Sequence, residues 1–223
     1  MAEEIVRNIW RIPVPLPDSP LRELNAYLIR GEDRSLLIDT GFRLPPCRQA
    51  VEEGLAQAGA DRTRLDVVCT HIHTDHTGQA DDLAGPGRTI YIGAGDYPMT
   101  RSDYDRRYWA IMDDRFLREG FPPEELRAVT AINPALTLGP PKDLPMETLE
   151  DGDVLTAGDH ALEVIAVPGH TPGRSASGWP GRGSCSRRIT SSSTSLPTSP
   201  CGPTCPTPWA GIWRAWSGSD PSR

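Results

Sequence analysis

The sequence predicts a mixed α/β protein in which helices cover β-sheets. Strand-like segments come first along the chain, and strands and helices then alternate, which is typical of sheets packed against helices. Apolar residues recur periodically through residues 1–173, with no internal repeat that would indicate a solenoid. At 223 residues and 24.4 kDa, the chain is long enough to bury a sizeable core.

Each expected element follows from a local pattern. Apolar alternation bounded by turn residues predicts strands, and a 3.6-residue apolar period predicts helices. We expect strands over 5–14, 26–30, 35–39, 65–70, 89–92, 153–156 and 161–167, and helices over 45–58, 97–119 and 123–131. A turn at 31–33 makes the first strands antiparallel, Gly59 ends the first helix, and Thr74 is expected to cap a helix that begins near His76.

The composition excludes several classes of function. A net charge of −7 argues against nucleic-acid binding through bulk positive charge. No apolar run approaches the roughly 20 residues of a membrane span, and the N-terminus lacks a signal-peptide pattern, so we expect a cytoplasmic protein without a membrane partner. The odd number of cysteines and the absence of CxxC predict reduced thiols, at Cys47, Cys69, Cys185, Cys201 and Cys205.

The chain divides into two stretches of different composition. Residues 1–173 carry 17 basic and 29 acidic side chains, whereas residues 174–223 carry six arginines and a single acid, Asp220. The second stretch is rich in Ser, Pro and Thr and shows no sustained helix or strand period. We therefore expect a folded domain over 1–173 and an irregular tail over 174–223.

The segment 70–78, Thr-His-Ile-His-Thr-Asp-His-Thr-Gly, carries three of the five histidines within six residues. Side chains two positions apart on an extended strand point the same way, so His71 and His73 are expected to converge on one metal ion. Asp75 and His76, where the chain turns, offer a second cluster beside it. Imidazole and carboxylate are the ligands that zinc and similar divalent ions take.

A second motif, Gly-His-Thr-Pro-Gly at 169–173, follows the last expected strand. Its glycines leave room for close backbone approach, and His170 is a suitable third ligand for the ion held by His71 and His73. His160 precedes that strand and is expected in a surface loop.

Together these motifs resemble the metallo-β-lactamase superfamily of metal-dependent hydrolases, in its glyoxalase II-like branch, over about residues 5–173. The resemblance implies an αββα sandwich with its C-terminal part incomplete. It also implies one or two zinc ions, with iron or manganese as alternatives. The residue roles that it implies are these: His71, His73 and His170 bind the first metal, Asp75 and His76 bind the second, Asp75 is catalytic, and Asp39 in Leu-Ile-Asp-Thr-Gly supports the metal loop.

Some of the candidate residues could instead have a purely structural role. Asp39 is also suited to an ordinary turn, and Cys69 fits a small buried residue far better than a metal ligand. Tyr104, Tyr108 and Trp109 fall within about one helical turn, where they would either line a substrate cleft or pack in the core or on the surface.

The chain departs from the family pattern after His170. Related hydrolases carry a later aspartate that bridges the metals and another histidine, and neither is present here. A frameshift near residues 174–177 would explain the departure, because synonymous codons for 188–203 permit Asp-His-Ile-Leu-Phe-His-Ile-Ser-Pro-Asn-Ile-Ser-Leu-Trp-Pro in the shifted frame. We therefore expect little or no hydrolysis by the chain as written.

The function predicted from the sequence is hydrolysis of a small ester, thioester, lactone or amide by a metal-activated hydroxide. The alternative is a truncated, non-catalytic metal-binding protein that lacks the bridging aspartate. An RNA-processing nuclease of the same superfamily is disfavoured by the acidic charge. The sequence does not specify the substrate or the oligomeric state.

Overall fold

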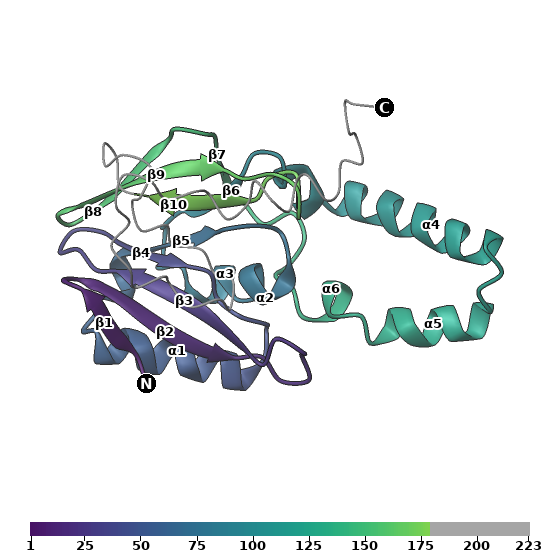
Figure 1. Cartoon of the computed structure of the whole chain (residues 1–223), viewed down its shortest axis with the longest axis horizontal. Helices are drawn as coiled ribbons and strands as arrows, with labels where there is room; N and C mark the ends of the chain where they lie inside the picture. Colours follow the sequence, from purple (N-terminus) through teal and green to yellow (C-terminus); the bar gives the residue numbers. More distant parts are fainter. Residues whose placement is uncertain (179–223) are drawn as a thin grey trace, which may run out of the picture.

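A computed structural model describes residues 1–178 of the chain and confirms the mixed α/β class (Figure 1). Its strands are β1 (Glu3–Val6), β2 (Ile9–Pro15), β3 (Glu23–Ile29), β4 (Ser35–Ile38), β5 (Leu65–Cys69), β6 (Ile90–Gly93), β7 (Glu147–Leu149), β8 (Val154–Ala157), β9 (His160–Ala166) and β10 (Ser175–Gly178). Its helices are α1 (Pro45–Gln57), α2 (Thr74–Thr77), α3 (Ala80–Leu83), α4 (Ser102–Arg118), α5 (Pro123–Ala131) and α6 (Pro134–Thr137), with 3₁₀ turns η1 (Arg62–Arg64) and η2 (Tyr97–Thr100).

The larger sheet has seven strands in the order β1-β2-β3-β4-β5-β6-β7. Strands β1 to β4 pair antiparallel, whereas β4, β5, β6 and β7 pair parallel to one another. The smaller sheet is antiparallel in the order β10-β9-β8. Because parallel strands end at the same edge of a sheet, the loops that follow β4, β5 and β6 meet there.

Strand alternation divides the core into two layers. On β3, Leu24, Ala26 and Leu28 face the layer that includes α1 and α3, while Tyr27 and Ile29 face the layer shared with the smaller sheet. This period of two is the pattern of a sheet buried on both faces. Helices thus cover one face of the large sheet and the small sheet covers the other, while no helix within residues 1–178 lies over the outer face of the small sheet.

Several expected boundaries were wrong. The strand expected over 5–14 is two strands, because Asn8 adopts a left-handed conformation (φ 62°) and reverses the chain between β1 and β2. The helix expected over 97–119 is interrupted at Arg101, which is extended (ψ 137°) between η2 and α4. The side chain of Thr74 does not cap a helix: Thr74 is the first residue of the four-residue α2, and His73 occupies the N-cap position.

The expectation of irregular structure from residue 174 onward is wrong for Ser175–Gly178. These residues form β10, which pairs in regular register with β9, and the backbone N–H of Ser175 donates to the carbonyl of Thr70 at 2.9 Å. Their small side chains are buried, so main-chain pairing compensates for the lack of apolar bulk. The rest of the predicted tail, with Cys185, Cys201 and Cys205, lies outside the described residues.

Helices α4, α5 and α6 form an arm that projects from the sandwich (Figure 1). Neither α4 nor α5 contains a buried residue, and several large apolar side chains on the arm are exposed, Ile111 and Ile132 most of all. In the part of the chain that the structure describes, no helix is long and apolar enough to cross a bilayer.

Candidate metal centre

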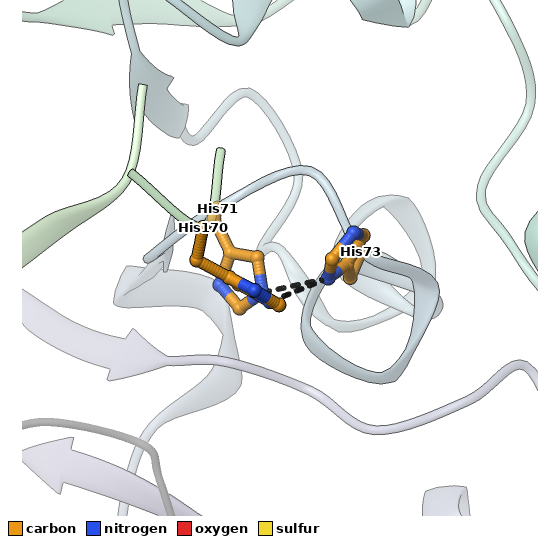
Figure 2. A group of neighbouring side chains, drawn as sticks. All are labelled: His71, His73 and His170. Carbon is orange, nitrogen blue, oxygen red and sulfur yellow. Dashed lines mark hydrogen bonds between the residues drawn. The ribbon is translucent and has the colours of Figure 1, made fainter. Parts of the chain in front are cut away.

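Three histidines from two loops converge at the edge of the sandwich. His71 and His73 follow β5, and His170 lies between β9 and β10, about one hundred residues later in the chain. Nε2 of His71 lies 3.1 Å from Nδ1 of His73, and Nε2 of His170 lies 2.9 Å from the same atom. Figure 2 shows the three rings with these nitrogens turned toward one another.

The donor set fits a divalent metal ion. One nitrogen from each ring lies within 4.8 Å of the others, and this is the one such group of histidine, cysteine or acidic side chains found within residues 1–178. Tetrahedral zinc with bonds of about 2.0–2.1 Å would place its ligand nitrogens roughly 3.3 Å apart, close to the spacing observed. A small contraction or expansion of the cluster would therefore accommodate the ion.

The electrostatics of the cluster favour neutral imidazole, the form that binds metals. Burial and the neighbouring rings of His76, His73 and His170 lower the pKa of His71 far below its ordinary value. Burial, followed by the influence of His170, also lowers the pKa of His73. These two side chains keep their nitrogen lone pairs available at neutral pH.

Asp39 lies beneath the histidine loop and organises it. It follows β4 with a φ of 62°, a left-handed conformation that aspartate tolerates better than most residues, and its side chain is fully buried. Its carboxylate accepts hydrogen bonds from the backbone N–H of Thr70 at 2.9 Å and from the Thr70 hydroxyl at 2.9 Å. Asp39 is therefore bonded to the start of the histidine loop at Thr70, and its role in supporting a metal site stays a prediction.

His76 faces two carboxylates. Its Nδ1 lies 2.9 Å from Oδ2 of Asp39, and its Nε2 lies 3.3 Å from Oδ2 of Asp75. Burial alone would lower the pKa of His76, but the two carboxylates outweigh it and raise the pKa to about 9. Burial acts to raise the pKa of Asp75, but its hydrogen bond to His76 and the nearby charges outweigh that effect and lower it.

The two expected ligand clusters thus differ in geometry. The imidazoles of His71 and His76 are close, with ring centroids 3.9 Å apart, so the second cluster does lie beside the first. However, Asp75 and His76 are paired with each other, and His76 is also paired with Asp39. The role of Asp75 and His76 as ligands of a second ion stays a prediction.

A buried carboxylate that the sequence analysis missed lies behind the cluster. Asp96 follows β6 and is fully buried. One oxygen, Oδ2, accepts hydrogen bonds from the backbone N–H of Ile72 at 3.0 Å and from the Thr171 hydroxyl at 2.7 Å, while Oδ1 accepts from the backbone N–H of Gly173 at 2.7 Å. The sequence signal that could have pointed to Asp96 is the Gly93-Ala94-Gly95 segment before it, since closely spaced glycines mark a place where another backbone approaches closely.

A cavity of about 370 Å³ opens beside His73 and His170. Tyr104, Tyr108 and Trp109 of α4 line it, which favours the cleft-lining alternative for these residues. The opposite side is formed by α6 and the loop that follows it, so the cavity lies between the metal centre and the projecting arm.

Two further expectations concern residues outside the cluster. Cys69 is fully buried in the core at the end of β5, as expected, and does not belong to the histidine group. The placement of His160 in a loop was wrong. It is the first residue of β9, because the β8–β9 hairpin pairs it with Ala157, and its Nε2 lies 2.8 Å from the carbonyl of Arg7.

Comparison of the sequence with known proteins finds a matching family and similar curated proteins. A family model described as the metallo-beta-lactamase superfamily matches residues 20–184. The chain is 29% identical over 157 residues to the human acyl-coenzyme A thioesterase MBLAC2 and 30% identical over 161 residues to the bovine protein of that name. Each match covers 67% of this chain and 51% of the relative, so the chain spans about half the length of these curated relatives.

Solved structures show the same fold. A metallo-beta-lactamase family protein from Thermus thermophilus superposes with a TM-score of 0.62 at 25% identity, over 78% of this chain and 56% of that one. The subclass B3 metallo-beta-lactamase BJP-1 of Bradyrhizobium japonicum gives a TM-score of 0.54 at 21% identity, over 84% and 60% of the two chains. The second likeness concerns the fold alone.

Proposed function

Because this chain belongs to the metallo-β-lactamase superfamily, we propose that it is a metal-dependent hydrolase of acyl thioesters. The observation that carries the proposal is the convergence of three imidazoles: Nε2 of His71 and Nε2 of His170 lie 3.1 and 2.9 Å from Nδ1 of His73. Zinc is the ion we propose, with iron or manganese as alternatives, because imidazole binds all of them. A divalent ion held there supplies a Lewis acid for the thioester carbonyl and lowers the pKa of water.

The chain's own residues would divide the remaining work. The three histidines hold the ion as neutral donors, and Asp39 fixes the loop that carries two of them through Thr70. Asp75 has a lowered pKa and stays ionised at neutral pH, so its carboxylate is available to accept a hydrogen bond from the attacking water. The protonated His76 beside it neutralises charge and holds Asp75 in place.

Two observations support a thioester substrate. The curated relatives named above are described as acyl-coenzyme A thioesterases. The region that the family model matches, residues 20–184, includes both histidine motifs. In addition, the cavity beside His73 and His170 is lined mainly by apolar and aromatic side chains, which suits an uncharged acyl group better than a charged one.

The experiment is a substrate panel with the full chain, assayed after zinc loading and after removal of metal by a chelator. Because the chain lacks the later aspartate and histidine of related hydrolases, we expect weak but zinc-dependent release of free thiol from an acyl-pantetheine thioester, and still slower turnover of a lactone, a phosphodiester and a β-lactam. His73→Ala should abolish thiol release, whereas the matched variant His160→Ala should retain it. Thiol release that is independent of metal, or a preference for another substrate class, would contradict the proposal.

A second candidate is a metal-binding protein without catalytic activity. The sequence observation that favours it is the absence of histidine after His170 and of any acid after that position except Asp220. One tightly bound zinc per chain with no turnover on the whole panel would identify this function. Zinc binding together with thiol release would identify the hydrolase.

A further inference from the structure

The cavity between the metal centre and the helical arm carries an inference about which part of a substrate it holds. We propose that it binds the acyl chain of the substrate, as an apolar tail several carbons long, and not the charged carrier. The inference rests on the proposed function for its thioester, but the binding of an apolar chain is measurable without hydrolysis.

The lining of the cavity is apolar on the sides that a ligand would touch. Met99, Trp109, Leu136 and Met146 contribute to it, together with Ile72 of the metal loop. Because His73 and His170 are among the lining residues, a carbonyl placed at the candidate metal centre would have its attached chain beside these apolar residues. The volume of about 370 Å³ lies in the range of small-molecule sites.

Two threonine hydroxyls of the lining donate their hydrogen bonds within the protein. The hydroxyl of Thr77 donates to the carbonyls of Ile72 and His73, and the hydroxyl of Thr100 donates to the carbonyl of Tyr97. These hydroxyls therefore offer no donated hydrogen bond to a ligand, as expected of a site for hydrocarbon.

The same holds for the charged pair in the wall. Lys142 is the only lysine or arginine among the cavity-lining residues of the described chain, and its ammonium lies 2.8 Å from Oδ1 of Asp105. The indole N–H of Trp109 donates to that same oxygen at 3.2 Å. With its one cation paired, the cavity lacks the free positive charge that the phosphates of coenzyme A would need.

The test uses S-ethyl and S-hexyl pantetheine, thioethers that the enzyme cannot hydrolyse, with binding to the zinc-loaded full chain measured by calorimetry. Burial of one methylene tightens binding by up to about fourfold, so in a partly open cavity we expect the hexyl compound to bind roughly tenfold more tightly than the ethyl compound. Leu136→Ala should weaken binding of the hexyl compound by about threefold to fivefold and leave the ethyl compound unaffected.

Two variants complete the design. Ile132→Ala removes an apolar side chain of the same arm that is 78% exposed and outside the cavity lining, so it should change neither affinity. Ala135→Trp adds bulk at an exposed lining position and should weaken the hexyl compound selectively. Equal affinity for both compounds, or equal effects of Leu136→Ala and Ile132→Ala, would overturn the inference. Chain-length-dependent binding without turnover of the thioester would instead overturn the proposed hydrolysis and leave this inference standing.

A separate observation assigns a role to Asp96. We infer that Asp96 is a positioning residue, which joins the loop of His71 and His73 to the loop of His170. It bonds to the backbone of Ile72, which lies between the first two histidines, and to Thr171 and Gly173, which follow the third.

The segment that carries Asp96 packs closely against the His170 loop. A Cβ atom on Gly173 would meet the Asp96 backbone N and side chain, and a Cβ on Gly95 would lie 2.7 Å from the Pro172 carbonyl. The glycines therefore allow the segment after β6 to lie directly on the His170 loop. A carboxylate with two oxygen acceptors is needed there, because an amide would place its N–H₂ group against one of the N–H donors.

The test compares Asp96→Asn with Asp66→Asn. Asp66 is a matched control. It is buried and accepts a hydrogen bond from the backbone N–H of Thr89 at 3.0 Å, but it lies on β5 away from the histidine loops. We expect Asp96→Asn to weaken zinc binding by roughly tenfold or more in a chelator competition and to change the visible spectrum of the cobalt-substituted protein. Asp66→Asn should lower the stability of the metal-free chain while leaving zinc affinity within about twofold of the parent.

Thr171→Val tests the same assignment without changing the carboxylate. It removes a single O–H donor to Asp96 and should weaken zinc binding by a smaller factor, about threefold. Undiminished zinc affinity in Asp96→Asn, or equal weakening in Asp96→Asn and Asp66→Asn, would overturn the role given to Asp96.

Discussion

Replacing Asp39 by Asn should uncouple His76 from its buried carboxylate. The parent pair has Nδ1 of His76 2.9 Å from Oδ2 of Asp39, with both side chains buried. The substitution keeps the shape of the side chain but removes its charge. With Asp39 neutral, Asp75 is the one carboxylate of the pair that still raises the pKa of His76, so this pKa should fall from about 9 toward its ordinary value of 6.5.

The size of the effect follows from linkage. A folded-state pKa of about 9 against 6.5 in the unfolded chain corresponds to about 3 kcal/mol of stability. Because the folded state binds the proton more tightly, this stability is fully present below pH 6.5 and is lost as the pH rises through 9. The cost of Asp39→Asn in the metal-free protein should therefore be largest at pH 6 and smaller at pH 10, by up to about 3 kcal/mol, because Asp75 supplies part of the shift. The loss of hydrogen bonds to Thr70 adds a part of the stability cost that does not depend on pH.

The assay is urea denaturation of the metal-free parent and variant at pH 6, 8 and 10, with the His76 ring titrated by NMR. We expect the difference in unfolding free energy between parent and variant to shrink steadily as the pH rises. We also expect a lower His76 pKa in the variant. The same stability difference at all three pH values would refute the assignment of charge to the His76–Asp39 pair.

Three further predictions follow from the site. Gly93→Ala should lower the free energy of unfolding by about 1–3 kcal/mol and should also weaken zinc binding, because a Cβ atom at this position would meet the Gly173 carbonyl. Urea denaturation and zinc titration measure the two effects, and tight zinc binding in a destabilised variant would contradict the contact between the two loops. If His76 binds a second ion, that ion should displace close to one proton from the His76 ring at pH 7. Calorimetry in buffers of different ionisation enthalpy measures this release, and binding without proton release would exclude His76 as a ligand. The frameshift, expected near residues 174–177, would lie after Gly178 instead, since Ser175–Gly178 pair regularly with β9. Resequencing the gene should reveal that single-base shift, and restoring the frame should raise zinc stoichiometry and turnover together. Comparable activity in both chains would contradict the frameshift.

The strongest elements of the fold were predictable because their signals are local. The helix at Pro123–Ala131 was predicted at its observed bounds, and α1 begins at the expected residue, since proline at the start and apolar periodicity define each helix. Strand β7 was missed because three residues with a single buried side chain carry no usable period. Strand β10 was missed because Ser-Ala-Ser-Gly has no apolar alternation, and its pairing with β9 decides its structure.

The site was predictable in part for the same reason. The spacing of His71 and His73 is a local signal, and His170 was added through its Gly-His-Thr-Pro-Gly motif. Asp96 was not found, because a single aspartate after a strand resembles any turn residue until the fold brings Ile72 and Gly173 to it. The apolar cavity was equally hidden, since it is formed by segments brought together only by the arm.

The central claim is that His71, His73 and His170 form a site for a divalent ion. Its most direct test is the zinc content of the purified full chain after dialysis, measured by atomic emission for the parent, for the double variant His71→Ala/His73→Ala and for the control His160→Ala. We expect at least one zinc per chain in the parent and in the control, and none in the double variant. Zinc content that is unchanged in the double variant would contradict the claim.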